Sequence, residues 1–270
     1  MRWLILVLYL FCNGCDKLDC LAQYKLNDNL GNTLVVDSQG FSNGTATDNT
    51  SDLHVDGVLN GAFHFDGSQG INCNSYFHEA FNDSCSISLW IKPDDGLPAS
   101  SNGIFGGGAL TEYIALTLYN NGGTSRLAFG YRSQGNSVAF NADGLFTDGQ
   151  QDWKHIIITL EQVTDTQVTA KLYADNVLHT SVGPVTCVMS DYNQTSRKFA
   201  IGANQIFLAT YFKGSIDNFM IFNGILTEYE REWLYNDGLG TEVILTPGHN
   251  TLVLNPYFDE EDENFKLIGF

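Results

Sequence analysis

The chain has 270 residues and a mass of 29.8 kDa, which is enough for one large all-β domain with a substantial core. Thirteen Lys and Arg face 31 Asp and Glu, and the formal net charge of −18 excludes nucleic acid and anionic bilayer surfaces, which need a basic footprint. Hydrophobic residues make up 43 % and aromatic residues 13 %, far more than in a disordered acidic chain, so we expect a folded protein.

The N-terminus predicts a secretory signal peptide over residues 1–14. Arg2 is followed by an apolar run, residues 3–11, and then by small and polar residues, which is the order found in signal sequences. The run is too short to cross a bilayer, which takes about 20 residues. Gly14-Cys15 also matches the end of a bacterial lipoprotein signal, in which Cys15 would carry the lipid. The alternative is a segment retained as a hydrophobic strand or anchor.

Four further cysteines are candidates for disulfides, and they allow three pairings. Cys73 and Cys85 flank a short connection, which favours a bridge between them, and Cys20 would then pair with Cys187. The alternative is four free, partly buried thiols in a reducing compartment.

Short strands separated by turns rich in Gly, Asn, Asp and Ser extend from residue 20 to about residue 222. Ile87, Leu89 and Ile91 alternate with polar or aromatic residues over the stretch 86–92. The same period of two recurs over residues 113–119, 126–131, 155–160 and 169–175. Asp175-Asn176 suits a tight hairpin turn. This pattern predicts an antiparallel two-sheet sandwich or jelly roll.

One later segment has a helical pattern. Thr227 is followed three residues later by Glu230, which is the capping-box signature, and Gly238 is a typical helix stop. We therefore expect one short helix from about Glu228 to Asn236.

The residues after this helix predict a C-terminal extension. It covers residues 241–270 and contains an acidic run, residues 259–263. We interpret the run as a solvated end, with an interaction arm for another subunit as the alternative. The chain then divides into residues 1–14, a single domain over residues 20–240, and this extension.

Several stretches of the domain follow one another in a specific order: residues 21–28, 36–40, 58–67, 85–92, 152–155, 171–176, 201–202 and 212–222, then the helix. This order resembles the laminin G-like branch of the concanavalin A-like lectin and glucanase jelly rolls over about residues 20–238. The family places two curved antiparallel sheets face to face and binds partners at the rim or on the concave face. The resemblance therefore implies an all-β jelly-roll sandwich with one short C-terminal helix.

The resemblance also implies a structural calcium ion at the edge of the sandwich. Asp37, Asp66 and Asp217 are the candidate ligands, because each lies in a matching stretch beside a Gly-rich turn. Calcium takes about six to eight oxygen ligands, and tight turns expose carbonyls beside a carboxylate. The alternative is that these carboxylates cap turns through their own backbone. Asp217 lies within a predicted strand, where Asp is disfavoured.

Aromatic faces beside Arg, Asn and Asp are typical of glycan recognition. We expect the candidates on adjacent strands of one sheet: Trp90, Tyr113, Tyr119, Tyr131 and Arg132. Several of them are alternatively part of the core, and this applies most to Trp90. The run Gly106 to Gly108 predicts either a ligand loop with close backbone approach or a hairpin turn.

A catalytic site is not predicted. Jelly-roll glycosidases need two carboxylates facing one cleft, about 5–9 Å apart. Glu228, Glu230 and Glu232 are the one tempting set, but alternate residues of a helix diverge around its axis. We interpret Glu230 as a capping residue and the triplet as surface charge. No His-Glu-x-x-His zinc motif occurs.

These observations favour a non-catalytic carbohydrate- or glycoconjugate-binding or adhesion module on a secreted or surface-anchored protein. Its partner would be a glycan or glycoprotein, and any membrane anchoring would run through the N-terminus. A virion or other structural assembly protein, oligomeric through its jelly roll, is the first alternative. A glycoside-active enzyme is the second.

Overall fold

The computed structural model describes residues 20–204 and 210–242 of the chain. The predicted signal peptide, the lipidation candidate Cys15 and the acidic run of the C-terminal extension lie outside the described residues. None of the helices within the described ranges has the length and apolar character that a membrane-spanning helix requires.

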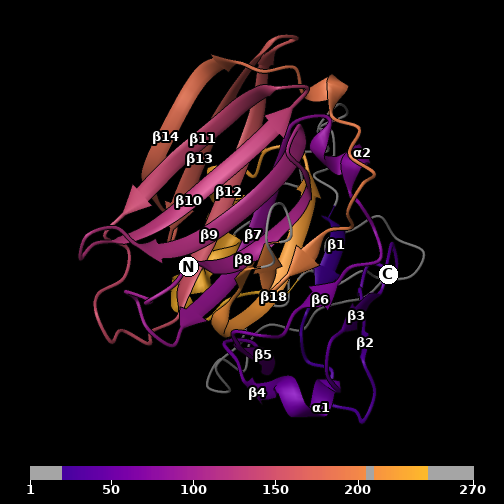
Figure 1. Ribbon diagram of the computed structural model, residues 1–270, viewed down its shortest axis with the longest axis vertical. Coiled ribbons are helices and arrows are strands. Elements are labelled where there is room, and N and C mark those ends of the chain that lie inside the picture. The colour runs from indigo at the N-terminus through magenta and orange to yellow at the C-terminus, as the bar shows by residue number, and fades with distance from the viewer. Residues whose placement is uncertain (1–19, 205–209, 243–270) are drawn as a thin grey trace, which may run out of the picture.

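Two antiparallel sheets of eight strands each lie over one another and form a sandwich (Figure 1). Sheet A runs in the order β14 (Val177–Thr186), β13 (Gln167–Ala174), β12 (Lys154–Thr164), β7 (Cys85–Pro93), β18 (Lys213–Asn223), β5 (Gly61–Asp66) and β4 (His54–Asp56), with β1 (Cys20–Tyr24) also paired to β18. Sheet B runs in the order β11 (Asn136–Asp143), β10 (Ser125–Ser133), β9 (Glu112–Asn120), β8 (Asn102–Ala109), β15 (Ala200–Ile201), β6 (Ile71–Asn72), β3 (Gly44–Ala46) and β2 (Leu34–Val35). The predicted all-β sandwich is confirmed.

Smaller elements connect and flank the two sheets. A two-stranded sheet consists of β16 (Ala203–Asn204) and β17 (Thr210–Tyr211). The helices are α1 (Thr50–Leu53), α2 (His78–Phe81) and α3 (Glu228–Tyr235), with 3₁₀ turns η1 (Met189–Asp191) and η2 (Asn236–Gly238).

The apolar side of each alternating strand fills the space between the sheets. On β10, Leu127, Phe129 and Tyr131 are buried, while the residues between them are half-buried on the opposite side. Successive side chains of a strand point to opposite faces, so the period of two in the sequence becomes a core on one side. The strands predicted over 86–92, 113–119, 126–131 and 155–160 are confirmed within β7, β9, β10 and β12, and that over 169–175 is confirmed as β13 except for Asp175, which lies in the following turn.

The predicted tight turn between β13 and β14 is also confirmed. Asp175 and Asn176 both have left-handed backbones, with φ of 49° and 61°. Two successive left-handed residues make the two-residue turn that matches the twist of a hairpin. The Asp175 carboxylate also accepts a hydrogen bond from the amide of His155 at 3.0 Å and forms an ion pair with Lys154. Both contacts connect the turn to β12.

The predicted helix is confirmed as α3, and its capping box forms. The hydroxyl of Thr227 accepts from the amide of Glu230, and the Glu230 carboxylate accepts from the amide of Thr227 at 2.8 Å. The end of the helix differs from the prediction, because Asn236 supplies the left-handed cap (φ 46°) before Gly238 is reached. Asn is the residue other than Gly that most readily takes this conformation.

Helix α3 packs on the outward side of sheet A and buries a second, smaller core. Leu226 and Leu234 pack there against Ile157, Met220 and Phe222 of the sheet. The guanidinium of Arg231 lies 3.9 Å from the ring centroid of Tyr173. The outward side of sheet A is therefore covered along much of its centre.

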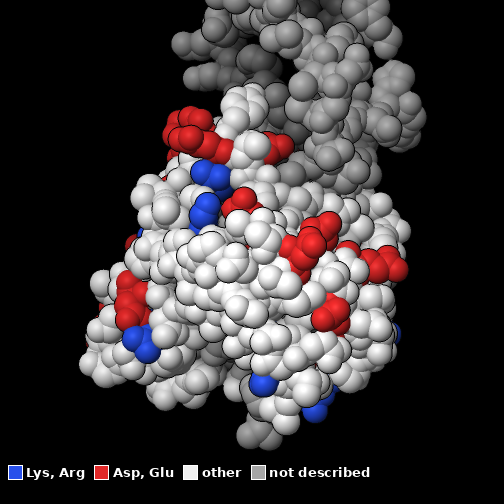
Figure 2. All heavy atoms as spheres, turned by 90° about the horizontal axis from the view of Figure 1, so that it is seen from above, with Lys and Arg blue, Asp and Glu red and all other residues white. Residues whose placement is uncertain are grey.

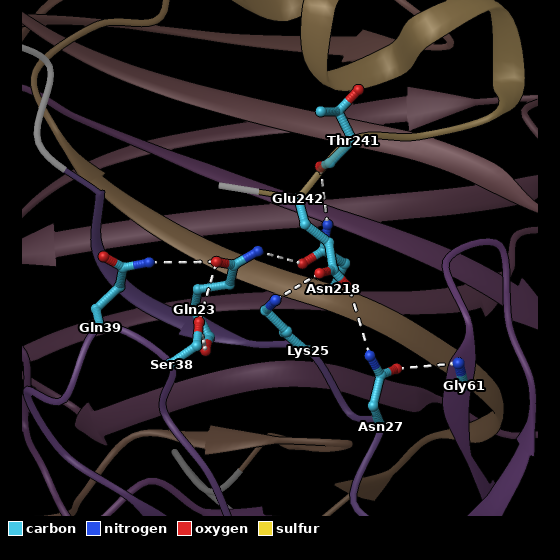
Figure 3. A network of polar contacts seen from close by, with 9 residues as sticks. All are labelled: Gln23, Lys25, Asn27, Ser38, Gln39, Gly61, Asn218, Thr241 and Glu242. Carbon is cyan, nitrogen blue, oxygen red and sulfur yellow. Dashed lines mark hydrogen bonds and ion pairs between the residues drawn. The ribbon is translucent and has the colours of Figure 1, made fainter. Parts of the chain in front are cut away.

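The chain leaving α3 is fastened to the sheet by a network of polar contacts (Figure 3). The side-chain amide of Asn218 on β18 donates to the carbonyl of Thr241 at 3.1 Å. Lys25, just after β1, forms an ion pair with Glu242, and Asn27 donates to the same carboxylate at 3.3 Å. These contacts hold residues 241 and 242 beside β1 and β18.

The same network continues inward from Asn218. Its carbonyl oxygen accepts from Gln23 of β1 at 2.8 Å, and both residues are fully buried. The Gln23 side chain in turn accepts from Ser38 and Gln39, at 3.0 and 3.2 Å (Figure 3). Buried amides need such partners, because an unpaired one would cost about 1–3 kcal/mol.

Candidate functional site

The outward side of sheet B carries three of the five side chains that the sequence suggested for glycan recognition. We call this surface the open face, and it consists of Tyr113, Ala115, Thr117 and Tyr119 on β9, Arg126, Ala128, Gly130 and Arg132 on β10, and Ser137, Ala139, Asn141 and Asp143 on β11. The four residues from β11 are all exposed. Strand alternation alone brings these twelve residues to one side.

Strand pairing arranges the open face into rows across the three strands. Arg126 lies opposite Tyr119 of β9 and Asp143 of β11, and this row forms one end of the face. Arg132 lies opposite Tyr113 and Ser137 and forms the other end. Tyr113 and Tyr119 are six residues apart on one strand, a separation of about 20 Å.

The middle of the open face has a floor of small side chains. Ala128 lies between Thr117 and Asn141, and Gly130 lies between Ala115 and Ala139. The ring of Tyr113 leans over Gly130, since a Cβ built there would lie 3.0 Å from the Tyr113 Cε2 atom. Small side chains therefore occupy the positions between the two tyrosines, and the Tyr113 ring lies over one of them.

A hydrogen-bonded group of three occupies the first end. Arg126 donates to both oxygens of Asp143, at 2.6 Å from Nε and 2.7 Å from Nη2. Its guanidinium also lies 5.9 Å from the ring centroid of Tyr119. Arg126 lowers the pKa of the Asp143 carboxyl, chiefly by this hydrogen bonding, and Asp143 raises the pKa of the guanidinium in the same way. The pair is therefore ionised and held in one geometry at neutral pH.

The other end of the open face is less tightly bonded. Arg132 donates from Nη1 to the carbonyl of Leu110 at 2.9 Å, while its Nε has no hydrogen-bond partner among the described residues. Nearby, the carboxylate of Glu112 accepts from the side chain of Gln134 at 2.9 Å and from the amide of Asn193 at 3.2 Å.

The paired strands β16 and β17 lie along the third side, beside β8. Asn204 of β16 donates to the hydroxyl of Thr117 at 3.1 Å. Gly103 of β8 permits this approach, because a Cβ there would lie 2.3 Å from the carbonyl oxygen of Thr210. The open face thus has two aromatic ends and one raised edge.

The glycine run of β8 is neither a ligand loop nor a turn, contrary to the prediction. Gly106, Gly107 and Gly108 lie within β8 and pair with β9. A Cβ on Gly107 would come within 3.0 Å of the Phe199 backbone, and one on Gly108 would lie 2.2 Å from the Glu112 carbonyl oxygen. The run is needed for close backbone packing across the sheet.

Two of the five candidate residues are buried away from the open face. Tyr131 points into the sandwich, because it shares the inward side of β10 with Leu127 and Phe129. Its hydroxyl donates to the carbonyl of Phe81 at 2.7 Å, and its ring stacks on Tyr192 at 5.2 Å. Tyr131 is a core residue.

Trp90 is also buried, but on the outward side of sheet A. Only 2 % of its surface is exposed. Its ring stacks on His155 of β12 at 4.7 Å and on Tyr235, the last residue of α3, at 5.9 Å. The end of α3 therefore covers the ring, and Trp90 packs beneath α3 and not between the two sheets.

Asp37 and Asp66, two of the three candidate calcium ligands, use their carboxylates to cap turns. Asp37 accepts from the amides of Gln23, Gln39 and Ser42, at 2.9–3.0 Å. Asp66 accepts from the amide and hydroxyl of Ser68, at 2.9 and 2.7 Å.

Asp217 is buried and caps a loop of sheet A. One carboxylate oxygen accepts from the amides of Val58 and Leu59, both at 2.8 Å, and the other has no partner among the described residues. Burial raises the pKa of Asp217 to about 8. No cluster of three or more His, Cys, Asp and Glu in the described ranges is arranged to hold a metal ion. The three Asp residues are thus not gathered into one such cluster, and each directs at least one carboxylate oxygen to a backbone amide.

The predicted disulfides do not form in this structure. Cys20, Cys73, Cys85 and Cys187 are all free thiols. Cys73 follows β6 of sheet B, whereas Cys85 begins β7 of sheet A, so the short connection between them crosses the sandwich. Burial raises the pKa of the Cys73 and Cys85 thiols, which makes them unreactive apolar groups.

The carboxylates of α3 do not form a catalytic pair. Glu230 is engaged in the capping box, with its carboxylate 2.7 Å from the Thr227 hydroxyl. Glu228 and Glu232 are four residues apart on this short helix and are both exposed at its surface.

Sequence reasoning missed Arg126, Thr117, Asn141, Asp143 and Asn204. Alternation alone could have placed Arg126 beside Arg132, since both are even-numbered residues of one strand. Asp143 could have been found from the two-residue turn at Gln134-Gly135, which sets the register of β10 and β11. Asn204 comes from a distant segment, and no local signal points to it.

Comparison with known proteins identifies relatives of this fold. Residues 65–230 match a family model described as Concanavalin A-like lectin/glucanases superfamily. A comparison with curated proteins finds no match.

Similar solved structures include Domain 4 of AbnA, a GH43 extracellular arabinanase from Geobacillus stearothermophilus, in complex with arabinotriose. It has a TM-score of 0.57 at 22 % identity, over 83 % of this chain and 99 % of that chain. The receptor binding domain of botulinum neurotoxin mosaic serotype C/D has a TM-score of 0.55 at 17 % identity, over 81 % and 50 %. The Ruminococcus gnavus IT-sialidase CBM40 bound to α2,6 sialyllactose has a TM-score of 0.50 at 13 % identity, over 63 % and 93 %. At these identities the likeness concerns the fold.

Proposed function

Because the chain belongs to the concanavalin A-like lectin/glucanases superfamily, we propose that it is a carbohydrate-binding module whose ligand lies on the open face. The fold by itself does not carry this proposal, since one fold serves many functions. What carries it is the arrangement of Tyr113 and Tyr119 at the two ends of a floor of small side chains, with polar groups around it.

This arrangement suits the two kinds of surface that a sugar presents. The C–H faces of a sugar ring pack on flat, apolar side chains, and a tyrosine offers such a face together with a polar tip. The hydroxyls need hydrogen-bonding groups held in place, and Arg126 and Asp143 are held by each other. Asn141 and Thr117 add further donors and acceptors at mid-length.

The comparisons support the proposal because two solved structures of similar fold are in complex with oligosaccharides. Domain 4 of AbnA is in complex with arabinotriose, and the CBM40 is bound to sialyllactose. We propose the same general role here, without catalysis, on a secreted or surface-attached protein. The carboxylates of α3 are not part of this role, since Glu230 is engaged in capping its helix.

The proposal is tested by titrating the protein with oligosaccharides after a broad glycan array has found a ligand. Tyr113→Ala and Tyr119→Ala are each expected to weaken binding about tenfold, or ~1.4 kcal/mol, because each removes one stacking surface. Tyr229→Ala is the matched control, because this tyrosine is 66 % exposed but lies on α3, away from the open face.

The expected result is loss of affinity in both open-face variants with unchanged thermal unfolding, and wild-type affinity in the control. An array without any ligand would overturn the proposal. So would variants of Tyr113 and Tyr119 that bind the ligand as well as the unaltered protein.

A further inference from the structure

We infer that the open face takes a neutral glycan and not an acidic one, an inference that rests on the proposed function. The charged side chains of the open face are Arg126, Arg132 and Asp143. Whether either end of the face carries more positive than negative charge decides which sugars it can hold.

The end with Arg126 carries no such excess, because Arg126 is paired with Asp143. Two of its N–H groups bind the two oxygens of Asp143, in the bidentate geometry that would otherwise receive a sugar carboxylate. Side-chain exposure is 21 % for Arg126 and 44 % for Asp143, so a ligand reaches both members of the pair together. An anionic sugar placed there would meet the Asp143 carboxylate as well as the guanidinium.

The paired groups are instead suited to hydroxyls. Asp143 accepts hydrogen bonds, and Arg126 retains N–H groups beyond the two bound to Asp143. A donor and an acceptor side by side match two neighbouring hydroxyls of a sugar ring, each of which donates and accepts. The row from Tyr119 to Asp143 is thus a neutral, polar end for the ligand.

The opposite end does not reverse this preference. Arg132 has neutral neighbours, Tyr113 and Ser137, in its row, and among the described residues its guanidinium binds the Leu110 carbonyl and no carboxylate. Glu112 lies at the same end and directs its carboxylate to Gln134 and the Asn193 amide. An acidic group and a basic group therefore both stand near this end.

The charge of the whole molecule acts in the same direction. The net charge is −18, and a negative field lowers the local concentration of anions. Acidic side chains are spread over the surface seen in Figure 2, with basic ones in small groups among them. An acidic glycan would approach against this field, whereas a neutral glycan is indifferent to it.

The inference is tested with a panel of neutral probes, including lactose and arabinotriose, and with sialyllactose as the acidic counterpart of lactose. We expect the tightest probe to be neutral, with an affinity that changes less than about twofold between low and high salt, because no ion pair is formed with the ligand. Sialyllactose is expected to bind no better than lactose.

A variant sharpens this test. Asp143→Asn removes the negative charge but keeps the shape, so Arg126 becomes free to pair with an anion. We expect this variant to bind the neutral probe about tenfold more weakly. We also expect the ratio of its affinity for sialyllactose to its affinity for lactose to rise. Glu161→Gln is the matched control, since it removes an exposed carboxylate from the ion pair with Lys171 on sheet A.

The outcomes separate the two proposals. Binding of an acidic probe more than about tenfold above its neutral counterpart, with a steep loss in high salt, would overturn the inference and leave the carbohydrate-binding role intact. Failure of every probe and of a broad glycan array would overturn the proposed function and the inference with it.

Discussion

The outward sides of the two sheets differ in what lies on them. Sheet A is covered by α3, which buries Trp90 and His155 under Tyr235. Sheet B exposes the whole outward side of β11 and leaves Tyr113 and Tyr119 half-buried on β9. The outward side of sheet A carries apolar residues such as Ile157 and Met220, whereas that of β11 is exposed and polar or small, so the strand sequences already differ where the helix covers one surface and leaves the other open.

The difference also shows in the polar groups. On sheet A, the Nδ1 atom of His155 and the Nε1 atom of Trp90 have no hydrogen-bond partner among the described residues. On sheet B, Arg126 and Asp143 satisfy one another in reach of solvent. Buried groups without partners reduce stability, whereas exposed paired groups are available to a ligand.

The largest expected effect is on the stability of the protein, which should fall far more for a substitution on the covered side of sheet A than for one on the open face of sheet B. Trp90→Ala should lower the free energy of unfolding by about 3–5 kcal/mol, because it leaves a cavity beneath α3. Tyr119→Ala on the open face should change it by less than about 0.5 kcal/mol. Denaturant unfolding of both variants measures the contrast, which would be lost if the two changes had similar effects.

A second prediction concerns pH and the covered side. Burial lowers the pKa of His155 to about 3 from the ordinary value of 6.5. The folded protein thus keeps His155 neutral while the unfolded chain takes up a proton below pH 6.5, so stability falls progressively as the pH drops from 6.5 towards 3. The contribution should reach about 2 kcal/mol between pH 6.5 and 5.

His155→Gln isolates this contribution, because Gln keeps a polar contact with Ser88 and does not titrate. The difference in unfolding free energy between wild type and variant should shift against the wild type as the pH falls. The charges next to His155, Lys154 and Asp175, are the same in both proteins. Asp217 has a raised pKa, so its contribution is lost as the pH rises towards 8, and it also cancels in the difference. Parallel pH curves would contradict the prediction.

The smallest expected effect concerns metal removal. A chelator should leave the melting temperature unchanged, because Asp37, Asp66 and Asp217 direct their carboxylates to backbone amides. Thermal unfolding with EDTA and with added calcium measures this. A chelator-dependent shift that Asp37→Asn or Asp217→Asn abolishes would restore the calcium prediction for those residues.

The strands and the helix could be predicted because their signals are local. Ile87, Leu89 and Ile91 alternate within seven residues, and Thr227 and Glu230 form their box within four. The role of the glycine run at 106–108 could not be predicted. These glycines are needed because the backbones of Phe199 and Glu112 pack closely against them, and the sequence around the run does not show that packing.

The site was predicted only in part. Alternation within β10 already puts Tyr131 on the side of Leu127, so its inward position follows from the sequence. The burial of Trp90 outside the main core does not, because it depends on where the end of α3 packs. Pairs that form across strands, such as Arg126 and Asp143, can be predicted only when the register of the two strands is known. That register is set by the hairpin turn between them.

The ion pair between Lys25 and Glu242 has a consequence for how the domain is attached to its chain. The described residues begin with β1 and end at Glu242, and the network in Figure 3 holds Glu242 against Lys25 and Asn27, which follow β1. A domain whose first and last strands or loops lie side by side can be joined to a longer polypeptide at a single place on its surface. Such a domain can be inserted into a surface loop of another protein with little change to that loop. The point of insertion would lie beside β1 of sheet A, whereas β9, β10 and β11 belong to sheet B.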